Sequence, residues 1–253
     1  TGAFGTLGVI SQAAFKLLPL PPEQQTVIAW FDNNESAQEV GMGFVNGLFV
    51  PEAISLLSGP LAAATVESAG EAGPNSDTWA LLIRLGGGVR SIERQVNEVV
   101  GAVGSAGATG YAVLSETAAK ATWAIIDDAE SAAEISVRMN ARTSDTLKAS
   151  QTILDNSPDA QSDVSTICDI GFGALTVVAP SGDDNQAQSF VNSVVASVTK
   201  NNGTYVIEKC PLVVKQNMDV FSDVGNALEL MRRIKSQYDP TNTLNPGRFA
   251  GKI

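Results

Sequence analysis

The sequence predicts an α+β protein built from a duplicated βαββαβ unit. The main observation is the order strand, helix, strand, strand, helix, strand, which occurs over residues 24–115 and again over 131–210. A second is that each long helical segment places its apolar residues on one face. A third is composition: 253 residues with 44% apolar and 17% charged side chains suffice for one or two buried cores.

The first unit follows a proline cluster at Pro19, Pro21 and Pro22, which marks a domain boundary. Before the cluster, alternating apolar residues predict a strand over 6–18. After it, the pattern predicts strands over 26–31, 51–57, 79–85 and 111–114, with 61–67 continuing the second strand. Helices are expected over 35–49, capped by Asn33 or Asn34, and over 89–103.

The second unit follows a connecting helix over 116–128. Strands are expected over 134–139, 163–168, 173–178 and 204–208, with helices over 144–154 and from Asp183 or Asp184 to Lys200. Because a βαββαβ unit carries both helices on one face of an antiparallel sheet, we expect each sheet to leave its other face free to cover something.

Charge and composition exclude several functions. The net charge of −11 and a pI near 4.4 disfavour nucleic acid and anionic lipid surfaces. No apolar run reaches the ~20 residues of a membrane helix. Histidine is absent, which removes the commonest general base and transition-metal ligand. Cys168 and Cys210 lie far apart, so we expect free, buried thiols, a reducing compartment and a cytoplasmic location.

The C-terminal stretch LELMRRIKSQYDPTNTLNPGRF combines a helix with two rigid turns. Apolar residues at helical spacing and a basic last turn predict a helix that ends near Tyr238, because Pro240 forbids its continuation. Asn245, Pro246 and Gly247 form a second turn. The ending suggests a docked C-terminus; an ordinary helix stop and tail is the alternative.

This ending closely resembles the C-terminal signature of FAD-linked oxidases of the vanillyl-alcohol oxidase type. The opening TGAFGTLGVISQ resembles the segment that closes the FAD-binding domain in that family. Together with PLVVKQNMDVF at 211–221, the two ends look most like the FAD-binding E subunits of bacterial glycolate oxidases. The resemblance implies that residues 1–20 end an FAD-binding domain and 21–210 form a cap, or substrate, domain whose sheet roofs the flavin. Residues 211–253 would be a return segment, helix and tail that pack on the FAD domain.

The same resemblance implies that Gly5, Thr6, Gly8 and Val9 lie along FAD through their main chain, and that Asn245 and Arg248 approach it at the other end of the chain. Gly2, Gly5 and Gly8 alone are not a dinucleotide fingerprint, because no strand, turn and helix unit precedes them. Glycines do let backbone groups approach a planar ligand closely. For Asn245 a purely structural turn is the alternative.

Arg84 and Arg138 are the candidate substrate ligands, since they are expected at matching places in the two units. On an uncovered sheet face either could bind a carboxylate bidentately, or it could form a surface ion pair instead. Asp127, Asp128 and Glu130 end a helix without a second cluster, so no metal site is expected. Glycines 86–88 and the series from 101 to 110 are interpreted as turns and close packing, and no catalytic residue is assigned.

Together these features predict the C-terminal fragment of an FAD-dependent oxidoreductase that oxidises a small 2-hydroxy acid, glycolate or D-lactate, by hydride transfer to flavin. The expected partners are the absent N-terminal FAD-binding half and other glycolate oxidase subunits, which could hold the protein at the inner membrane. The fragment itself should retain FAD poorly, and its uncovered apolar surface favours a homodimer. The alternative is a non-catalytic ferredoxin-like binding or assembly subunit.

Overall fold

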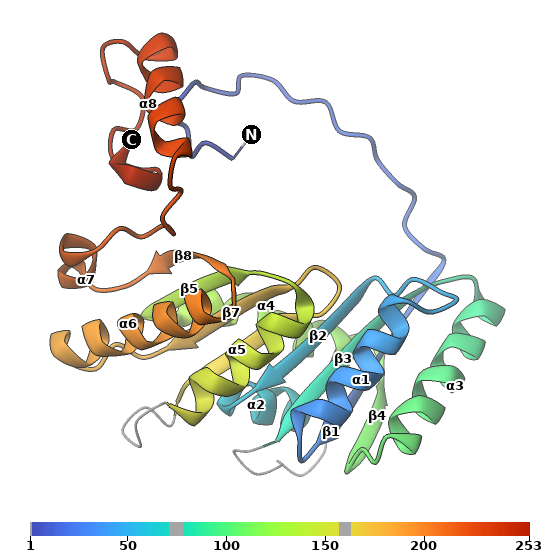
Figure 1. Cartoon of the computed structure of the whole chain (residues 1–253). Helices are drawn as coiled ribbons and strands as arrows, with labels where there is room; N and C mark the ends of the chain where they lie inside the picture. Colours follow the sequence, from blue (N-terminus) through green and yellow to red (C-terminus); the bar gives the residue numbers. More distant parts are fainter. Residues whose placement is uncertain (1, 71–77, 157–162) are drawn as a thin grey trace.

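A computed structural model describes residues 2–70, 78–156 and 163–253. Strands and helices alternate through most of this length, and two further helices follow the last strand (Figure 1). In chain order the elements are β1 (Glu23–Phe31), α1 (Asn34–Val45), β2 (Ala53–Ser58), α2 (Pro60–Ser68), β3 (Trp79–Gly87), α3 (Val89–Ser105), β4 (Gly110–Leu114), α4 (Glu116–Ala132), β5 (Ile135–Asn140), α5 (Thr143–Asp155), β6 (Ser165–Asp169), β7 (Ala174–Ala179), α6 (Asp184–Lys200), β8 (Thr204–Lys209), α7 (Leu212–Asn217), α8 (Ala227–Tyr238) and the 3₁₀ turn η2 (Ala250–Lys252).

The strands of the described residues form one antiparallel sheet in the order β4-β1-β3-β2-β6-β7-β5-β8. Each half has the same internal order, with the first strand between the third and the fourth, as connected βαββαβ units require. The halves join where β2 pairs with β6, and Leu56 stands opposite Cys168. The α+β class is therefore confirmed, with the two units fused into one continuous sheet.

Helices cover this sheet unequally. On one face α1, α3, α5 and α6 pack over a core that runs through both halves. On the other face α2 and α4 pack over the first half, against alternate residues of β3 such as Ala80 and Leu82. The expectation that each half leaves one face uncovered is thus wrong for the first half, because helix α2 and the connecting helix α4 were not assigned to that face.

Three predicted elements need correction. Residues 61–67 do not extend a strand but form α2, which Pro60 starts at its first position after Gly59 turns the chain with φ 71°. Helix α1 ends at Val45 instead of 49. No strand forms over 6–18, because residues 8–21 have no ladder partner among the described residues. The N-caps of α1 and α6 are Asn33 and Asp183, each the first of the two predicted candidates.

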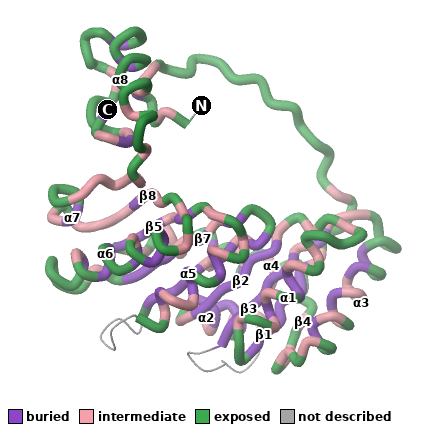
Figure 2. Tube along the Cα trace, viewed as in Figure 1, coloured by how far each residue is buried: buried purple, intermediate pink, exposed green. Residues whose placement is uncertain are grey.

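The two ends of the chain form a separate small unit, here called the end module, which consists of residues 2–6 and 219–253 (Figure 1). An extended segment over 7–22 leads from it to β1 and is exposed over most of its length (Figure 2). Six of its large apolar side chains are exposed: Val9, Ile10, Phe15, Leu17, Leu18 and Leu20. The module meets the sheet at β8, where Val220 and Ser222 exchange backbone bonds with Ile207 and Tyr205.

Both cysteines are free. Cys168 is fully buried and Cys210 is half-buried, so the expectation of buried thiols holds for the first only. Burial raises the pKa of the Cys168 thiol to about 12, which makes it an unreactive core residue. Among the helices that the structure describes, none is both long and apolar enough to cross a bilayer.

Candidate cofactor-contact site

The N-terminal turn of the end module is built around Thr6. Its backbone N–H and its hydroxyl both donate to the carbonyl of Ala3, at 2.9 and 2.7 Å. Phe4 and Gly5 have positive φ values of 49° and 74°, which close the turn. Thr6 is 1% exposed, so the turn is packed against the rest of the module.

The C-terminal turn is organised by Asp239, which ends α8. Its carboxylate accepts from the N–H groups of Thr243 and Leu244 at 3.0 and 2.7 Å and from the Thr243 hydroxyl at 3.1 Å. The hydrogen bond from the Lys235 ammonium, which is the largest cause, acts with these bonds to hold the pKa of Asp239 well below its usual range. The aspartate before Pro240 therefore has a structural role, because it folds the loop that carries Asn245.

Lys235 joins the two turns. Its ammonium donates to the Thr6 carbonyl at 2.8 Å, to Asp239 Oδ2 at 2.6 Å and to the Leu244 carbonyl at 2.7 Å. The residue is 7% exposed, so a buried charge has an ionised partner and its three protons have three acceptors. No sequence pattern assigned Lys235 a role beyond its interaction with the helix dipole.

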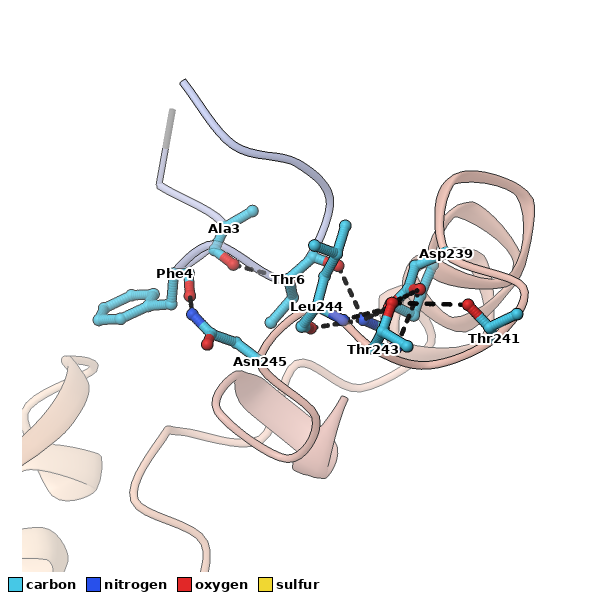
Figure 3. A network of polar contacts seen from close by, with 9 residues as sticks. Ala3, Phe4, Thr6, Asp239, Thr241, Thr243, Leu244 and Asn245 are labelled. Carbon is cyan, nitrogen blue, oxygen red and sulfur yellow. Dashed lines mark hydrogen bonds and ion pairs between the residues drawn. The ribbon is translucent and has the colours of Figure 1, made fainter. Parts of the chain in front are cut away.

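Asn245 lies directly against the N-terminal turn (Figure 3). Its side-chain amide donates to the Phe4 carbonyl at 2.8 Å, and its own φ is 41°. A Cβ added to Gly5 would stand 2.6 Å from Asn245 Nδ2, so the close approach depends on glycine. The structure thus brings Gly5, Thr6 and Asn245 together from opposite ends of the chain.

An aromatic cluster packs beside this contact. The rings of Phe4, Phe221 and Phe249 have centroids 5.3 to 5.8 Å apart, with edge-on and stacked pairs. These phenylalanines come from three separate segments, and sequence reasoning did not connect them. Phe221 and Phe249 are each the last residue of a motif that carries the resemblance. Their place in these motifs is the sequence signal that could have indicated a contact between them.

Gly8, Val9 and Arg248 do not join the contact. Gly8 and Val9 lie in the exposed extended segment, where Val9 is 83% exposed. Arg248 donates its backbone N–H to the Asn245 carbonyl at 3.3 Å, and the residue is exposed. Their suggested contact with FAD stays a prediction.

Arg84 and Arg138 lie on the same face of the sheet but not at matching places, because β3 is the third strand of its half and β5 the first. Arg84 pairs with Glu52 at 3.6 Å and lies 4.8 Å above the ring of Trp123 in α4. Arg138 pairs with Glu130 of α4 at 3.4 Å and with Glu208 of β8 at 3.3 Å. The two arginines therefore fix α4 across the sheet.

Glu130 and Glu208 meet beside Arg138 and interact strongly. A hydrogen bond with Glu130 and partial burial raise the pKa of Glu208 to about 7, although Arg138 opposes this shift. The same hydrogen bond lowers the pKa of Glu130. Glu208 is thus partly protonated at neutral pH. In the described part of the chain, no group of three His, Cys, Asp or Glu side chains could hold a metal, and this includes the acidic end of α4.

The residues of the end module fit one edge of a planar cofactor. Gly5 presents main chain without a side chain, and the Asn245 amide can both donate and accept. Both residues are exposed, so a ligand can reach them from one side.

Comparison with known proteins places the chain among flavoprotein oxidases. The model of the family "FAD linked oxidases, C-terminal domain" matches residues 20–146 and 221–249, so the chain belongs to this family. The resemblance to this family is thereby confirmed, and the matched residues include the C-terminal motif as far as Phe249.

One curated relative is glycolate oxidase subunit GlcD of Bacillus subtilis (strain 168), 22% identical over 99% of this chain and 56% of the relative. The chain therefore spans about half of that protein. The expected likeness was to the E subunit of the same enzyme, and the relative found is the D-type subunit.

Solved structures of vanillyl-alcohol-oxidase type share the fold. They include 4-ethylphenol oxidase from Gulosibacter chungangensis (16% identity, TM-score 0.58, 92% of this chain and 54% of that one) and p-cresol methylhydroxylase (14%, 0.56, 92% and 54%). Alkyldihydroxyacetonephosphate synthase matches 96% of this chain and 47% of its own, at 14% identity and a TM-score of 0.55.

Proposed function

We propose that the chain is the C-terminal part of an FAD-dependent oxidoreductase that oxidises a small 2-hydroxy acid of the glycolate or D-lactate type. Family membership supports the cofactor class, and the glycolate oxidase relative supports the substrate class. The observation that carries the proposal is the contact of Asn245 with Phe4 and Gly5, because residues from both family motifs meet in one place.

In this proposal residues 1–20 and 211–253 belong to the FAD-binding side of the protein, and residues 21–210 form the cap. Gly5, Thr6, Gly8 and Val9 contact the cofactor through main chain, and Asn245 and Arg248 approach it from the C-terminal turn. When bound, FAD supplies the acceptor for a hydride removed from the carbon that bears the substrate hydroxyl.

Arg84 and Arg138 stay candidates for the substrate carboxylate. Each already pairs with glutamate, so a substrate would have to compete with Glu52 at one site and with Glu130 and Glu208 at the other. Because the pKa of Glu208 is raised and that of Glu130 is lowered, a substrate carboxylate at Arg138 would compete mainly with Glu130 at neutral pH.

The test is a titration with FAD, followed by flavin fluorescence, of this chain and of the same chain extended upstream by its gene. We expect the extended protein to bind FAD and to be bleached by glycolate or D-lactate under anaerobic conditions, and the 253-residue chain to bind FAD poorly. An extended protein that ignores flavin would contradict the proposal and favour a non-catalytic binding or assembly subunit. Purification of the 253-residue chain with stoichiometric FAD would contradict the proposal that FAD binding needs the N-terminal half.

A further inference from the structure

The end module has very few connections between its two chain segments. In the described residues, two hydrogen bonds join 2–6 to 219–253: Lys235 to the Thr6 carbonyl and Asn245 to the Phe4 carbonyl. The contacts of the Phe4 ring with Phe221 and Phe249 complete the connection. Of these residues, Lys235 is the one whose donating side chain is buried, since Asn245 is exposed and Phe4 is half-exposed.

Lys235 also holds the C-terminal turn in place, together with Asp239. Its bond to the Leu244 carbonyl fixes the residue before Asn245, and its bond to Asp239 fixes the carboxylate that accepts from Thr243 and Leu244. One ammonium group therefore sets the position of the N-terminal turn and of the loop that presents Asn245. An ammonium suits this position, because its three protons point in three directions, whereas a guanidinium is planar.

We propose that Lys235 is the positioning residue of the cofactor-contact site: it joins the two chain ends so that Gly5, Thr6 and Asn245 form one surface. Lys235 itself is buried below this surface and acts through Thr6 and Leu244. The role toward the cofactor rests on the proposed function, whereas the joining of the ends does not.

The first experiment measures amide hydrogen exchange of the full chain for peptides that cover 3–8 and 240–248. Lys235→Met keeps an unbranched side chain as far as the Cε position and removes all three bonds, so exchange in both peptides should rise on the order of tenfold or more, while peptides from β3 and β7 stay unchanged. Arg233→Met is the matched control, since Arg233 lies on the same helix and its side chain is 73% exposed; it should change neither peptide.

A second variant separates Lys235 from the other connection. Asn245→Ala removes the single bond to Phe4 and should raise exchange in 3–8 less than Lys235→Met does, with 240–248 nearly unaffected. Unchanged exchange of 3–8 in Lys235→Met, or an equal effect of Arg233→Met, would overturn the proposal. Asn245→Ala loosening both peptides as much as Lys235→Met would also overturn it.

The role toward the cofactor is measured on the upstream-extended protein. Lys235→Met should lower FAD affinity on the order of tenfold and change the fluorescence of the bound flavin, with the melting temperature of the sheet unchanged. Wild-type affinity and spectrum in that variant would overturn the positioning role. If the wild-type extended protein binds no FAD, both the proposed function and the role of Lys235 toward the cofactor are wrong. The exchange data then decide by themselves whether Lys235 joins the two chain ends.

Discussion

The sheet and the end module are held together by different forces. The interior of the sheet is mainly apolar, with Phe31, Leu56 and Leu82 fully buried. The most buried residues of the end module include Thr6, Lys235 and Asp239, whose polar groups are satisfied by one another and by backbone. The sheet therefore draws its stability from apolar burial, whereas the end module depends on a few specific bonds.

The largest expected effect is in the sheet. Leu56→Ala, at the junction of the two halves, should lower the free energy of unfolding by about 2–5 kcal/mol, because it leaves a cavity in the shared core. Chemical denaturation measures this change. Leu48→Ala is the control: Leu48 is 92% exposed, so the same chemical change should cost no more than about 0.5 kcal/mol. Equal losses in the two variants would contradict the assignment of the core.

A smaller effect concerns pH and belongs to the sheet. The pKa of Glu208 is raised in the folded protein to about 7, so the folded state holds a proton that the unfolded state releases near 4.5. The stability contributed by protonated Glu208 is therefore full below about pH 4.5 and is lost as pH rises to about 7.

Glu208→Gln keeps the hydrogen bond but cannot titrate. Between about pH 5 and 8 the melting temperature of the variant should therefore change less with pH than that of the wild type, by on the order of a few degrees or less. Arg138 and Glu130 lie against this carboxyl, Ser136 donates to Glu130, and all three stay in place in the variant. An unchanged pH profile would show that Glu208 titrates normally. Exchange of the end module should be the same in both proteins.

The sheet was largely predictable from sequence, because its signals are local. Alternation of apolar residues predicted most strands, and Asn33 and Asp183 marked helix starts. The run after Pro60 was misassigned, since a short apolar segment rich in alanine fits a strand or a buried helix equally well. The strand expected over 6–18 was wrong for another reason. Its apolar pattern is typical of a strand, but no strand of the described chain pairs with it.

The candidate site was predictable only through the resemblance at the two ends. The motifs named Gly5, Thr6 and Asn245, yet no local pattern indicates that Thr6 and Lys235, 229 residues apart, share a hydrogen bond. The arginines illustrate the same limit: Arg84 and Arg138 had similar strand contexts, whereas their places in the sheet depend on topology.

The claim that the two chain ends form one cofactor-contact surface is tested by a footprint of FAD on the upstream-extended protein, measured by amide hydrogen exchange. We expect FAD to slow exchange in 3–8 and 243–248 together, and to leave peptides at the start of α3, beyond the sheet, unaffected. Protection confined to one chain end, or found at the α3 start with both ends unchanged, would show that the two ends do not form one such surface.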